Sequence, residues 1–328
     1  AMISLRVMMA MVMIGGVSGV SWGQTTVFVD DYNRAVLSPG GTPSMTYTPT
    51  LVGTSTATII SSSFLRIANG TTNGVSYVTG STTTFSSPYN STLSSNTGLV
   101  TWTFNFKYNR TSDPAGIVSG SYGTAIALAG SSATLTTGTG YAIIYGNSST
   151  PDPIRLVRYS NGLGTSTNII TSGVSDISAV NNYVSVRVTY NPTGNIWALY
   201  IRDDGASAWA DPASGVTNQI GSNTVDNTYT STALNNFGFV WSHAATAAAT
   251  KSDDFDNFKV TVTASTNYFL KSGGLVSNLA DWGQNTDGTG TNPSGLGDAN
   301  INWNIRNNAA VTNDVAWTLG SGSKVIVG

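Results

Sequence analysis

Hydrophobic and polar side chains alternate along many short segments of this chain. The clearest segment is residues 99–108, which places Val100, Trp102, Phe104, Phe106 and Tyr108 on one side and Thr101, Thr103, Asn105 and Lys107 on the other. Successive side chains of a β-strand point to opposite faces. The segment therefore predicts a strand with one apolar face and one polar face.

A second pair of alternating segments predicts a β-hairpin. Tyr183–Tyr190 and Ile196–Arg202 flank the short linker Asn191–Asn195, which contains Pro192 and Gly194. Proline fixes one backbone angle of a turn and glycine permits a positive one, so this linker is a turn between two antiparallel strands.

Further alternating segments recur about every ten to twenty residues, with Gly, Ser, Thr and Asn between them. They are Ala57–Ile67, Val75–Val78, Thr124–Leu128, Tyr141–Tyr145, Ile154–Tyr159, Ser166–Ile170 and Phe237–Trp241. No segment carries a sustained apolar stripe of helical period, and we interpret the short run Ala244–Ala249 as a loop. This pattern predicts an all-β fold, an antiparallel β-sandwich.

Two acidic and aromatic segments mark the ends of this sandwich. Val27–Ala35 and Lys251–Val260 each read as a strand that carries a pair of carboxylates. We expect the first and last strands to pair, which gives a domain of residues 24–264.

The remaining segment, residues 265–328, has a different pattern. Thr261–Thr266 reads as a polar hinge, and a loop rich in Gly, Asn and Thr follows from Gly283 to Asn300. Short strands are expected at Asn267–Gly274, Ile301–Arg306, Val315–Leu319 and Ser323–Gly328. Such spacing is typical of the first rungs of a β-solenoid, and the absence of a cap leads us to expect that the natural chain continues beyond Gly328.

The first 23 residues have the organisation of a secretory signal peptide. Arg6 precedes the apolar run Val7–Val17, and Ser21-Trp22-Gly23 matches a cleavage site before Gln24. No other stretch approaches the roughly 18 apolar residues of a membrane span. We therefore expect a secreted protein, extracellular or attached to the cell surface.

Composition narrows the possible partners. Charged residues make up 9% of the chain, with 14 basic against 16 acidic residues, and every acidic residue is Asp. Typical soluble proteins have about 25% charged residues. So few and balanced charges create only a weak electrostatic field around the protein. This gives no reason to expect a nucleic acid or an anionic membrane as partner. Cysteine is absent, so disulfides contribute nothing to stability.

Five segments within residues 25–264 match a known superfamily: Asp30–Ala35, Tyr183–Tyr190, Trp197–Gly205, Phe237–Trp241 and Asp254–Val260. Through these segments the sequence resembles the laminin-G-like branch of the concanavalin A-like lectin/glucanase superfamily. Trp303–Arg306 and Ser321–Gly328 resemble segments that open the repeat regions of large surface proteins of type IX-secreting bacteria. The resemblance implies a jelly-roll sandwich in an extracellular module that often binds carbohydrate or protein. It does not imply a particular ligand.

A calcium site is the sharpest chemical hypothesis. If the terminal strands pair, Asp30, Asp31, Asp253, Asp254 and Asp256 come close together, and Ca²⁺ binds six to eight oxygens. Adjacent strand residues point to opposite faces, so only Asp31 and Asp256 are expected to share one site. The alternative is that these carboxylates cap loops, pair with Arg34 or Lys251, or charge an edge strand against aggregation. We read the turn-like segments Asp281–Gly288 and Asp203–Gly205 as plain turns.

Enzymatic sites find little support in the sequence. The superfamily that the sequence resembles includes glucanases, whose catalytic strand carries two Glu. This chain has no Glu. His243 is the single histidine, no Gly-x-Ser-x-Gly motif accompanies it, and there is no Cys. We interpret His243 as a surface or loop residue and expect no catalysis.

Sugar binding requires exposed aromatic rings beside polar side chains. The candidate residues are Trp209, Tyr89 and Tyr229, each in a predicted loop, whereas Trp102, Trp197 and Trp241 lie on strands and are expected in the core. The leading hypothesis is a non-catalytic binding module for polysaccharides or glycoprotein glycans. The alternatives are a structural spacer or cap of an adhesin, and an accessory module of an exported hydrolase.

Overall fold

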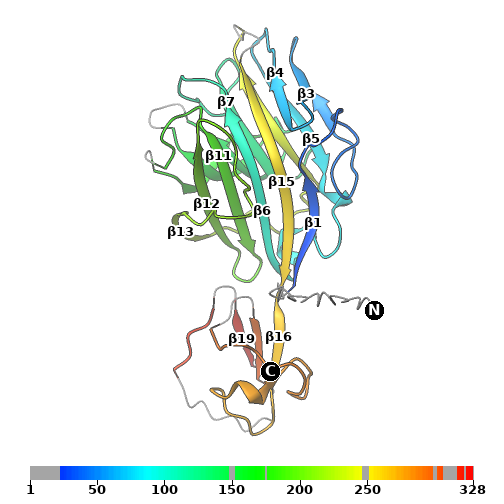
Figure 1. Ribbon diagram of the computed structural model, residues 1–328, viewed down its shortest axis with the longest axis vertical. Coiled ribbons are helices and arrows are strands. Elements are labelled where there is room, and N and C mark those ends of the chain that lie inside the picture. Colours follow the sequence, from blue (N-terminus) through cyan, green and yellow to red (C-terminus); the bar gives the residue numbers. More distant parts are fainter. Residues whose placement is uncertain are drawn as a thin grey trace, which may run out of the picture.

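The chain folds into a large β-sandwich followed by a smaller β-rich segment (Figure 1). The computed structural model describes residues 23–147, 152–173, 176–245, 251–297, 301–305, 316–320 and 323–327. Apart from Gly23, the predicted signal peptide lies outside these residues. The described helices are three single 3₁₀ turns, η1 (Thr82–Thr84), η2 (Leu93–Ser95) and η3 (Leu279–Asp281).

The first sheet of the sandwich has eight antiparallel strands. In spatial order they are β13 (Gln219–Val225), β12 (Ile196–Gly205), β11 (Tyr183–Asn191), β6 (Gly98–Tyr108), β15 (Ser252–Ala264), β4 (Phe64–Ala68) and β3 (Thr56–Ile60), with β1 (Gln24–Asp30) also paired to β15. One edge of β15 pairs with β6, and the other pairs first with β4 and then with β1. The expected pairing of the two terminal strands is confirmed.

The second sheet has seven strands and is covered on its outward side. Its order is β10 (Ser166–Thr171), β9 (Ile154–Ser160), β8 (Thr139–Tyr145), β7 (Gly123–Gly130), β14 (Asn236–His243), β5 (Gly74–Ser81) and β2 (Thr48–Thr50). Loop residues Ile117, Leu135 and Leu163 form a second apolar cluster with its outward side chains. This face is therefore closed.

The core lies between the two sheets and is rich in aromatic rings. Phe258 of β15 stacks on Phe237 of β14 with ring centroids 4.7 Å apart, and Trp102 stacks on Trp197 at 6.0 Å. These residues are fully buried. The alternation read along residues 99–108 is confirmed, since Val100, Trp102, Phe104, Phe106 and Tyr108 all belong to this core.

Strand β15 contains a β-bulge that changes which residues face the core. Asp256 lies opposite Asn105 of β6, but Lys259 lies opposite Thr103, so β15 has one extra residue here. Asn257 adopts a positive φ of 51° at this point. Even-numbered residues face outward before the bulge and odd-numbered ones after it.

The C-terminal segment folds around its own small core. Strand β16 (Thr266–Leu270) follows β15 after Ser265 and pairs in parallel with β18 (Ile301–Ile305), which pairs in parallel with β19 (Lys324–Val327). The two-residue strand β17 (Trp282–Gly283) pairs antiparallel to β16. Tyr268 stacks on Trp303 at 5.7 Å. The solenoid stays a prediction.

The all-β antiparallel sandwich is confirmed, while several element boundaries are wrong. The segment Ala57–Ile67 is a hairpin, β3 and β4, because Ser61 and Ser62 adopt positive φ angles. The segment 27–35 is strand only as far as Asp30. The polar hinge predicted at Thr261–Thr266 is wrong, since β15 extends through Ala264. Residues 316–320 form no strand, and Val315 lies outside the described residues.

The bulge allows a direct test of the backbone conformation at Asn257. Both Asn257→Gly and Asn257→Ala remove the same side chain, but only glycine adopts a positive φ without steric cost. We expect the alanine variant to be less stable than the glycine variant by about 1–2 kcal/mol. For a domain of this size, each kcal/mol lowers the melting temperature by about 2–4 °C. Equal melting temperatures in differential scanning calorimetry would contradict the assignment.

Candidate functional site

The outward face of the first sheet carries polar side chains in rows that cross the strands. Each row takes one residue from β11, one from β6 and one from β15. The successive rows are Tyr183–Lys107–Asp254, Ser185–Asn105–Asp256, Arg187–Thr103–Lys259 and Thr189–Thr101–Thr261. Loops cover the outward face of the second sheet. The outward face of the first sheet is therefore the candidate binding surface.

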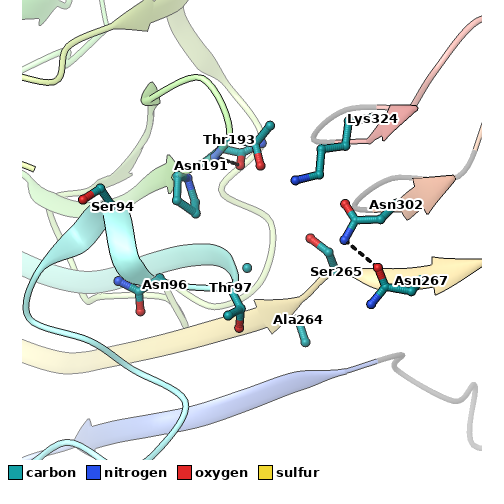
Figure 2. A pocket seen from close by; sticks show the side chains of 12 residues that line it. Ser94, Asn96, Thr97, Asn191, Thr193, Ala264, Ser265, Asn267, Asn302 and Lys324 are labelled. Atoms are coloured by element: carbon teal, nitrogen blue, oxygen red, sulfur yellow. Dashed lines mark hydrogen bonds between the residues drawn. The ribbon is translucent and has the colours of Figure 1, made fainter. Parts of the chain in front are cut away.

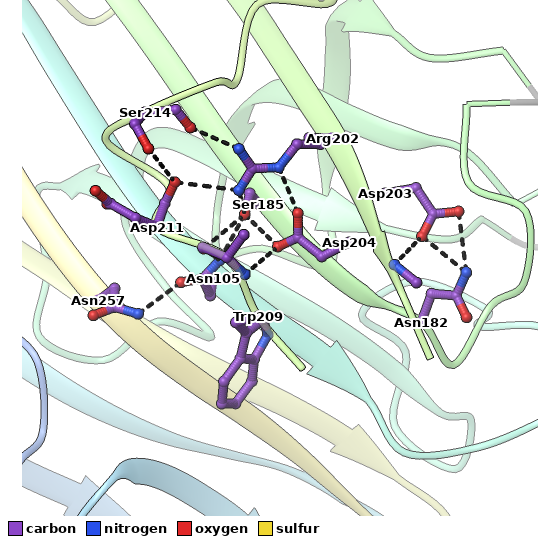
Figure 3. A network of polar contacts seen from close by, with 12 residues as sticks. Asn105, Asn182, Ser185, Arg202, Asp203, Asp204, Trp209, Asp211, Ser214 and Asn257 are labelled. Carbon is purple, nitrogen blue, oxygen red and sulfur yellow. Dashed lines mark hydrogen bonds and ion pairs between the residues drawn. The ribbon is translucent and has the colours of Figure 1, made fainter. Parts of the chain in front are cut away.

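A loop between β12 and β13 lies across the second row and is held there by hydrogen bonds (Figure 3). The Arg202 guanidinium forms an ion pair with Asp204 at 2.5 Å and donates to the carbonyls of Asp211 and Ser214. Asn105 of β6 donates to the carbonyl of Ala210 at 3.1 Å. The loop is thus fixed at several points and divides the face in two.

Two aspartates at the end of β12 hold two different segments in place. Asp204 accepts hydrogen bonds from Ser185 Oγ and from the backbone N–H of Ala210. Asp203 accepts hydrogen bonds from Ser178, Gly205 and Asn182. Burial alone would raise the pKa of Asp203, but these hydrogen bonds outweigh burial and hold its pKa below the usual value. Asp204 therefore holds the loop between β12 and β13, whereas Asp203 holds the segment that precedes β11.

On one side, the loop residue Trp209 forms an aromatic patch with Phe64 and Tyr183. The Trp209 ring meets Tyr183 edge to face at 5.0 Å and Phe64 at 5.4 Å, and its Nε1 donates to the carbonyl of Phe106 at 3.1 Å. Lys107 Nζ lies 4.0 Å from the centre of the Tyr183 ring. All three rings are half-buried, so the patch offers partly exposed aromatic surface next to a cation.

On the other side lies a threonine groove of about 190 Å³. Its lining comes from β1, β6, β11, β15 and the braced loop, and consists of Gln24, Leu99, Thr101, Thr103, Arg187, Thr189, Ala213, Lys259, Thr261 and Thr263. Thr103 is 6% exposed. Its hydroxyl oxygen and Arg187 Nε are buried without a hydrogen-bond partner among the described residues. A buried polar group without a partner costs about 1–3 kcal/mol, so these two atoms mark a place for a ligand or water.

The structure treats the three predicted sugar-binding aromatics differently. Trp209 belongs to the aromatic patch beside the groove. Tyr89 packs against Phe85 at 5.0 Å with its hydroxyl buried, and burial raises its pKa well above the usual value. Tyr229 packs edge to face on Tyr141 of β8. The last two rings are partly buried against the core, away from the first sheet's outward face.

The aspartates predicted to bind calcium are engaged by other partners. Asp30 pairs with Arg34 at 2.5 Å and accepts from the Tyr47 hydroxyl at 2.7 Å. Asp254 receives both Arg66 Nε and Nη2, at 2.6 and 2.7 Å. Asp253 faces inward and accepts from Thr124 Oγ1, and burial raises its pKa well above the usual value.

The two remaining carboxylates, Asp31 and Asp256, interact through their charges. Burial first, and then the negative charges of Asp31 and Asp30, raise the pKa of Asp256 to about 7 despite a hydrogen bond from the Asn257 N–H. Within the described residues, no three Asp or His side chains form a group able to hold a metal ion. Two carboxylates fall short of the six to eight oxygens of Ca²⁺. The calcium hypothesis stays a prediction, and this geometry favours the capping and ion-pair alternative.

The prediction for His243 is wrong, because strand β14 extends through this residue into the interior. Its ring is fully buried, stacks on Trp241 at 4.4 Å, and places Nε2 within 3.0 Å of Ser76 Oγ. Burial lowers the pKa of His243 below its ordinary value, which favours the neutral ring. Because no substrate reaches a fully buried ring, this Ser–His contact is structural. Residues 246–250 of the predicted Ala-rich loop lie outside the described residues.

A larger cleft of about 630 Å³ lies between the sandwich and the C-terminal segment (Figure 2). Asn191 and Thr193 of the sandwich line one side, and Asn267, Asn302 and Lys324 line the other. Asn302 donates to Asn267 at 3.0 Å. The lining contains no aromatic ring and one charged side chain, so it offers less specific chemistry than the threonine groove.

Sequence reasoning placed Thr101 and Thr103 on the polar face of β6 but missed the groove. Arg187 and Lys259 were not singled out as site residues. The alternation of residues 183–190 is a signal that could have placed Arg187 on the outward face. The bulge in β15 left no such signal for Lys259.

Comparisons with known proteins identify fold similarity at low sequence identity. No family model matches the chain, and neither does any curated protein. Lectin II from Ulex europaeus has 13% identity and a TM-score of 0.44, covering 71% of this chain and 97% of that chain. The metal-free lectin I-B4 from Griffonia simplicifolia has 11% identity and a TM-score of 0.41, covering 65% and 92%. A Bauhinia forficata lectin in complex with GalNAc has 10% identity and a TM-score of 0.42, covering 73% and 99%. TM-scores below 0.5 do not establish a shared site.

Among the described residues, no helix is long and apolar enough to cross a membrane.

The raised pKa of Asp256 predicts a pH-dependent effect of Asp256→Asn. In the folded protein this carboxyl has a pKa of about 7, against about 3.9 in an unfolded chain. The folded state therefore holds the proton more tightly, and stability falls as pH rises from about 4 to 7. As pH rises from about 4 to 7, we expect the free energy of unfolding of the variant to increase relative to that of the wild type. Above pH 7 the difference should stay constant. Asp176→Asn is the control, and a pH-independent difference for Asp256→Asn in thermal melts would contradict the pKa.

Removal of divalent cations tests the metal prediction. Because Asp30 and Asp254 already bind arginines, we expect EDTA to leave the melting temperature of the chain unchanged. A bound ion stabilises the folded state by mass action, so its removal would lower that temperature. A decrease that Ca²⁺ reverses and Mg²⁺ does not would establish a calcium site instead.

Proposed function

We propose that residues 24–264 form a non-catalytic carbohydrate-binding module of an exported protein, and that the sugar lies on the outward face of the first sheet. The buried, unpartnered hydroxyl of Thr103 in the threonine groove carries this proposal. It lies among several threonine hydroxyls, which match the donors and acceptors of a saccharide.

The aromatic patch adds the second chemical element of sugar recognition. Trp209 of the braced loop, together with Tyr183 and Phe64, presents partly exposed rings on the same face as the groove. Loop and sheet together form a rigid scaffold, so little ordering entropy is lost when a ligand binds.

The chemistry of this face supports binding and not bond cleavage. The nearby Asp204 is ion-paired, Asp254 is held by Arg66, and the single histidine is buried elsewhere. Glycoside hydrolysis requires two carboxyl groups, one as acid and one as base or nucleophile. No such pair lines the threonine groove.

Binding of the purified chain to a broad array of polysaccharides and glycans tests the proposal. The key variant is Thr103→Val, which keeps the side-chain shape but removes the unpartnered hydroxyl. We expect the variant to be at least as stable as the wild type, because it removes a buried hydroxyl without a partner. We also expect a loss of affinity of about five- to tenfold, the effect of one hydrogen bond. The matched control is Thr167→Val, on an exposed position of β10 in the second sheet.

Two results would overturn this function. One is a blank array with folded protein, which would favour the structural spacer. The other is glycan binding that Thr103→Val and Trp209→Ala both leave unchanged, since the sugar would then bind another face.

A further inference from the structure

We propose that the threonine groove selects an acidic polysaccharide, whose carboxylate or sulfate group is bound between Arg187 and Lys259. This inference rests on the proposed carbohydrate-binding function and adds the chemical class of the ligand. The observations that carry it are the charges of the groove, the contacts of Arg187 and the position of Thr103.

The groove contains two cations and no carboxylate. Arg187 on β11 and Lys259 on β15 both lie directly opposite Thr103 on the intervening strand β6. Adjacent strands are about 4.8 Å apart, so the two backbones are separated by roughly 10 Å. An anionic group between these side chains would meet positive charge from both sides.

Arg187 differs from the arginines that have structural partners. Arg34, Arg66, Arg158 and Arg202 each form an ion pair with an aspartate. Arg187 instead lies over the Tyr200 ring at 4.0 Å, and its Nε has no hydrogen-bond partner among the described residues. Stacking on an aromatic ring orients a guanidinium and leaves its edge free to bind a carboxylate or sulfate through two N–H groups.

Thr103 supplies a third donor between the two cations. Thr103 lines the groove, and its hydroxyl is buried without a hydrogen-bond partner among the described residues. The nearest carboxylate in the cross-strand rows is Asp256, one row away, and it already accepts two hydrogen bonds from Asn257. A neutral sugar would leave both cations without a counter-charge, whereas an acidic one provides it.

A nucleic acid fits these observations less well. The chain carries a net charge of −2, and the lining of the groove contains two cations. Binding along a phosphate backbone usually draws on an extended basic surface. The short, hydroxyl-rich groove instead matches a single acidic group on a chain of hydroxyl-bearing sugars.

Affinity measurements on the full chain with defined polymers test the inference. The probes are polygalacturonate and alginate as uronates, dextran sulfate as a sulfated polymer, dextran and galactan as neutral polymers, and double-stranded DNA and inorganic sulfate as competitors. We expect binding to at least one acidic polysaccharide at physiological salt and no comparable binding to neutral ones. Uronate and sulfated probes separate the two anion sources.

Charge-removing variants locate the site. Arg187→Gln and Lys259→Gln should each weaken acidic binding about tenfold or more. Arg187→Lys should give an intermediate loss, because it keeps the charge and loses the planar fork. Lys324→Gln, in the C-terminal segment, is the control and should have no effect. If Arg187→Gln fails to fold, Lys259→Gln and Arg187→Lys still decide the question.

The possible failures are distinguishable. Neutral glycans that bind, lose affinity with Thr103→Val and tolerate Arg187→Gln would overturn the acidic specificity and leave the carbohydrate function intact. A folded protein that binds no glycan overturns both. Equal binding of DNA, or competition by millimolar sulfate as strong as that by the polymer, would show a general anion site and overturn the polysaccharide assignment.

Discussion

The outward face of the first sheet depends on the single extra residue in strand β15. Before the bulge, Phe255 faces the core and Asp254 faces solvent; after it, Phe258 faces the core and Lys259 faces solvent. A regular strand would place Phe258 outward and Lys259 among the aromatic rings of the core, where an unpaired charge is strongly unfavourable. The bulge therefore reconciles the aromatic core with the row of polar side chains that lines the threonine groove.

The two outward faces of the sandwich differ in how loops cover them. On the second sheet, outward alanines and Ile144 are covered by loop residues. The close approach of Leu135 to Gly238 leaves no room for a side chain there. On the first sheet, the one loop that crosses the face is held by polar contacts through Arg202, Asp204 and Asn105. Polar contacts fix this loop while leaving the threonines beside it uncovered. The result is a rigid, partly open polar surface on one side of an otherwise closed domain.

The sequence predicts those features that depend on local pattern. Alternation along β6 separates the core residue Trp102 from the groove residue Thr103, and the Pro–Gly turn locates the β11–β12 hairpin. The pairing of Asp30 with Arg34, four residues away, was also among the open alternatives. The pairing of the first and last strands was predicted, but the side-chain contacts between distant segments were not. His243 is buried because Gly70 leaves space for its ring, and Asp254 binds Arg66 from a strand far away in the sequence. The orientation of Lys259 required knowledge of the bulge.

Because charged residues are scarce in this chain, the unpaired cations Arg187 and Lys259 have a strong effect on the local electrostatic potential. Charged residues make up only 9% of the chain, so few other charges contribute to the electrostatic potential at any one position. Several aspartates are bound to arginines: among the described residues, Asp30, Asp204, Asp226 and Asp254 each hold one. Such pairs are locally neutral and contribute little to the field beyond a Debye length of about 8 Å. Arg187 and Lys259, which lie across a groove without a carboxylate, consequently create a local positive potential on a protein of net negative charge. Since burial of unpaired donors is unfavourable in the free protein, an anionic ligand that satisfies them removes this unfavourable term and gains affinity at this position.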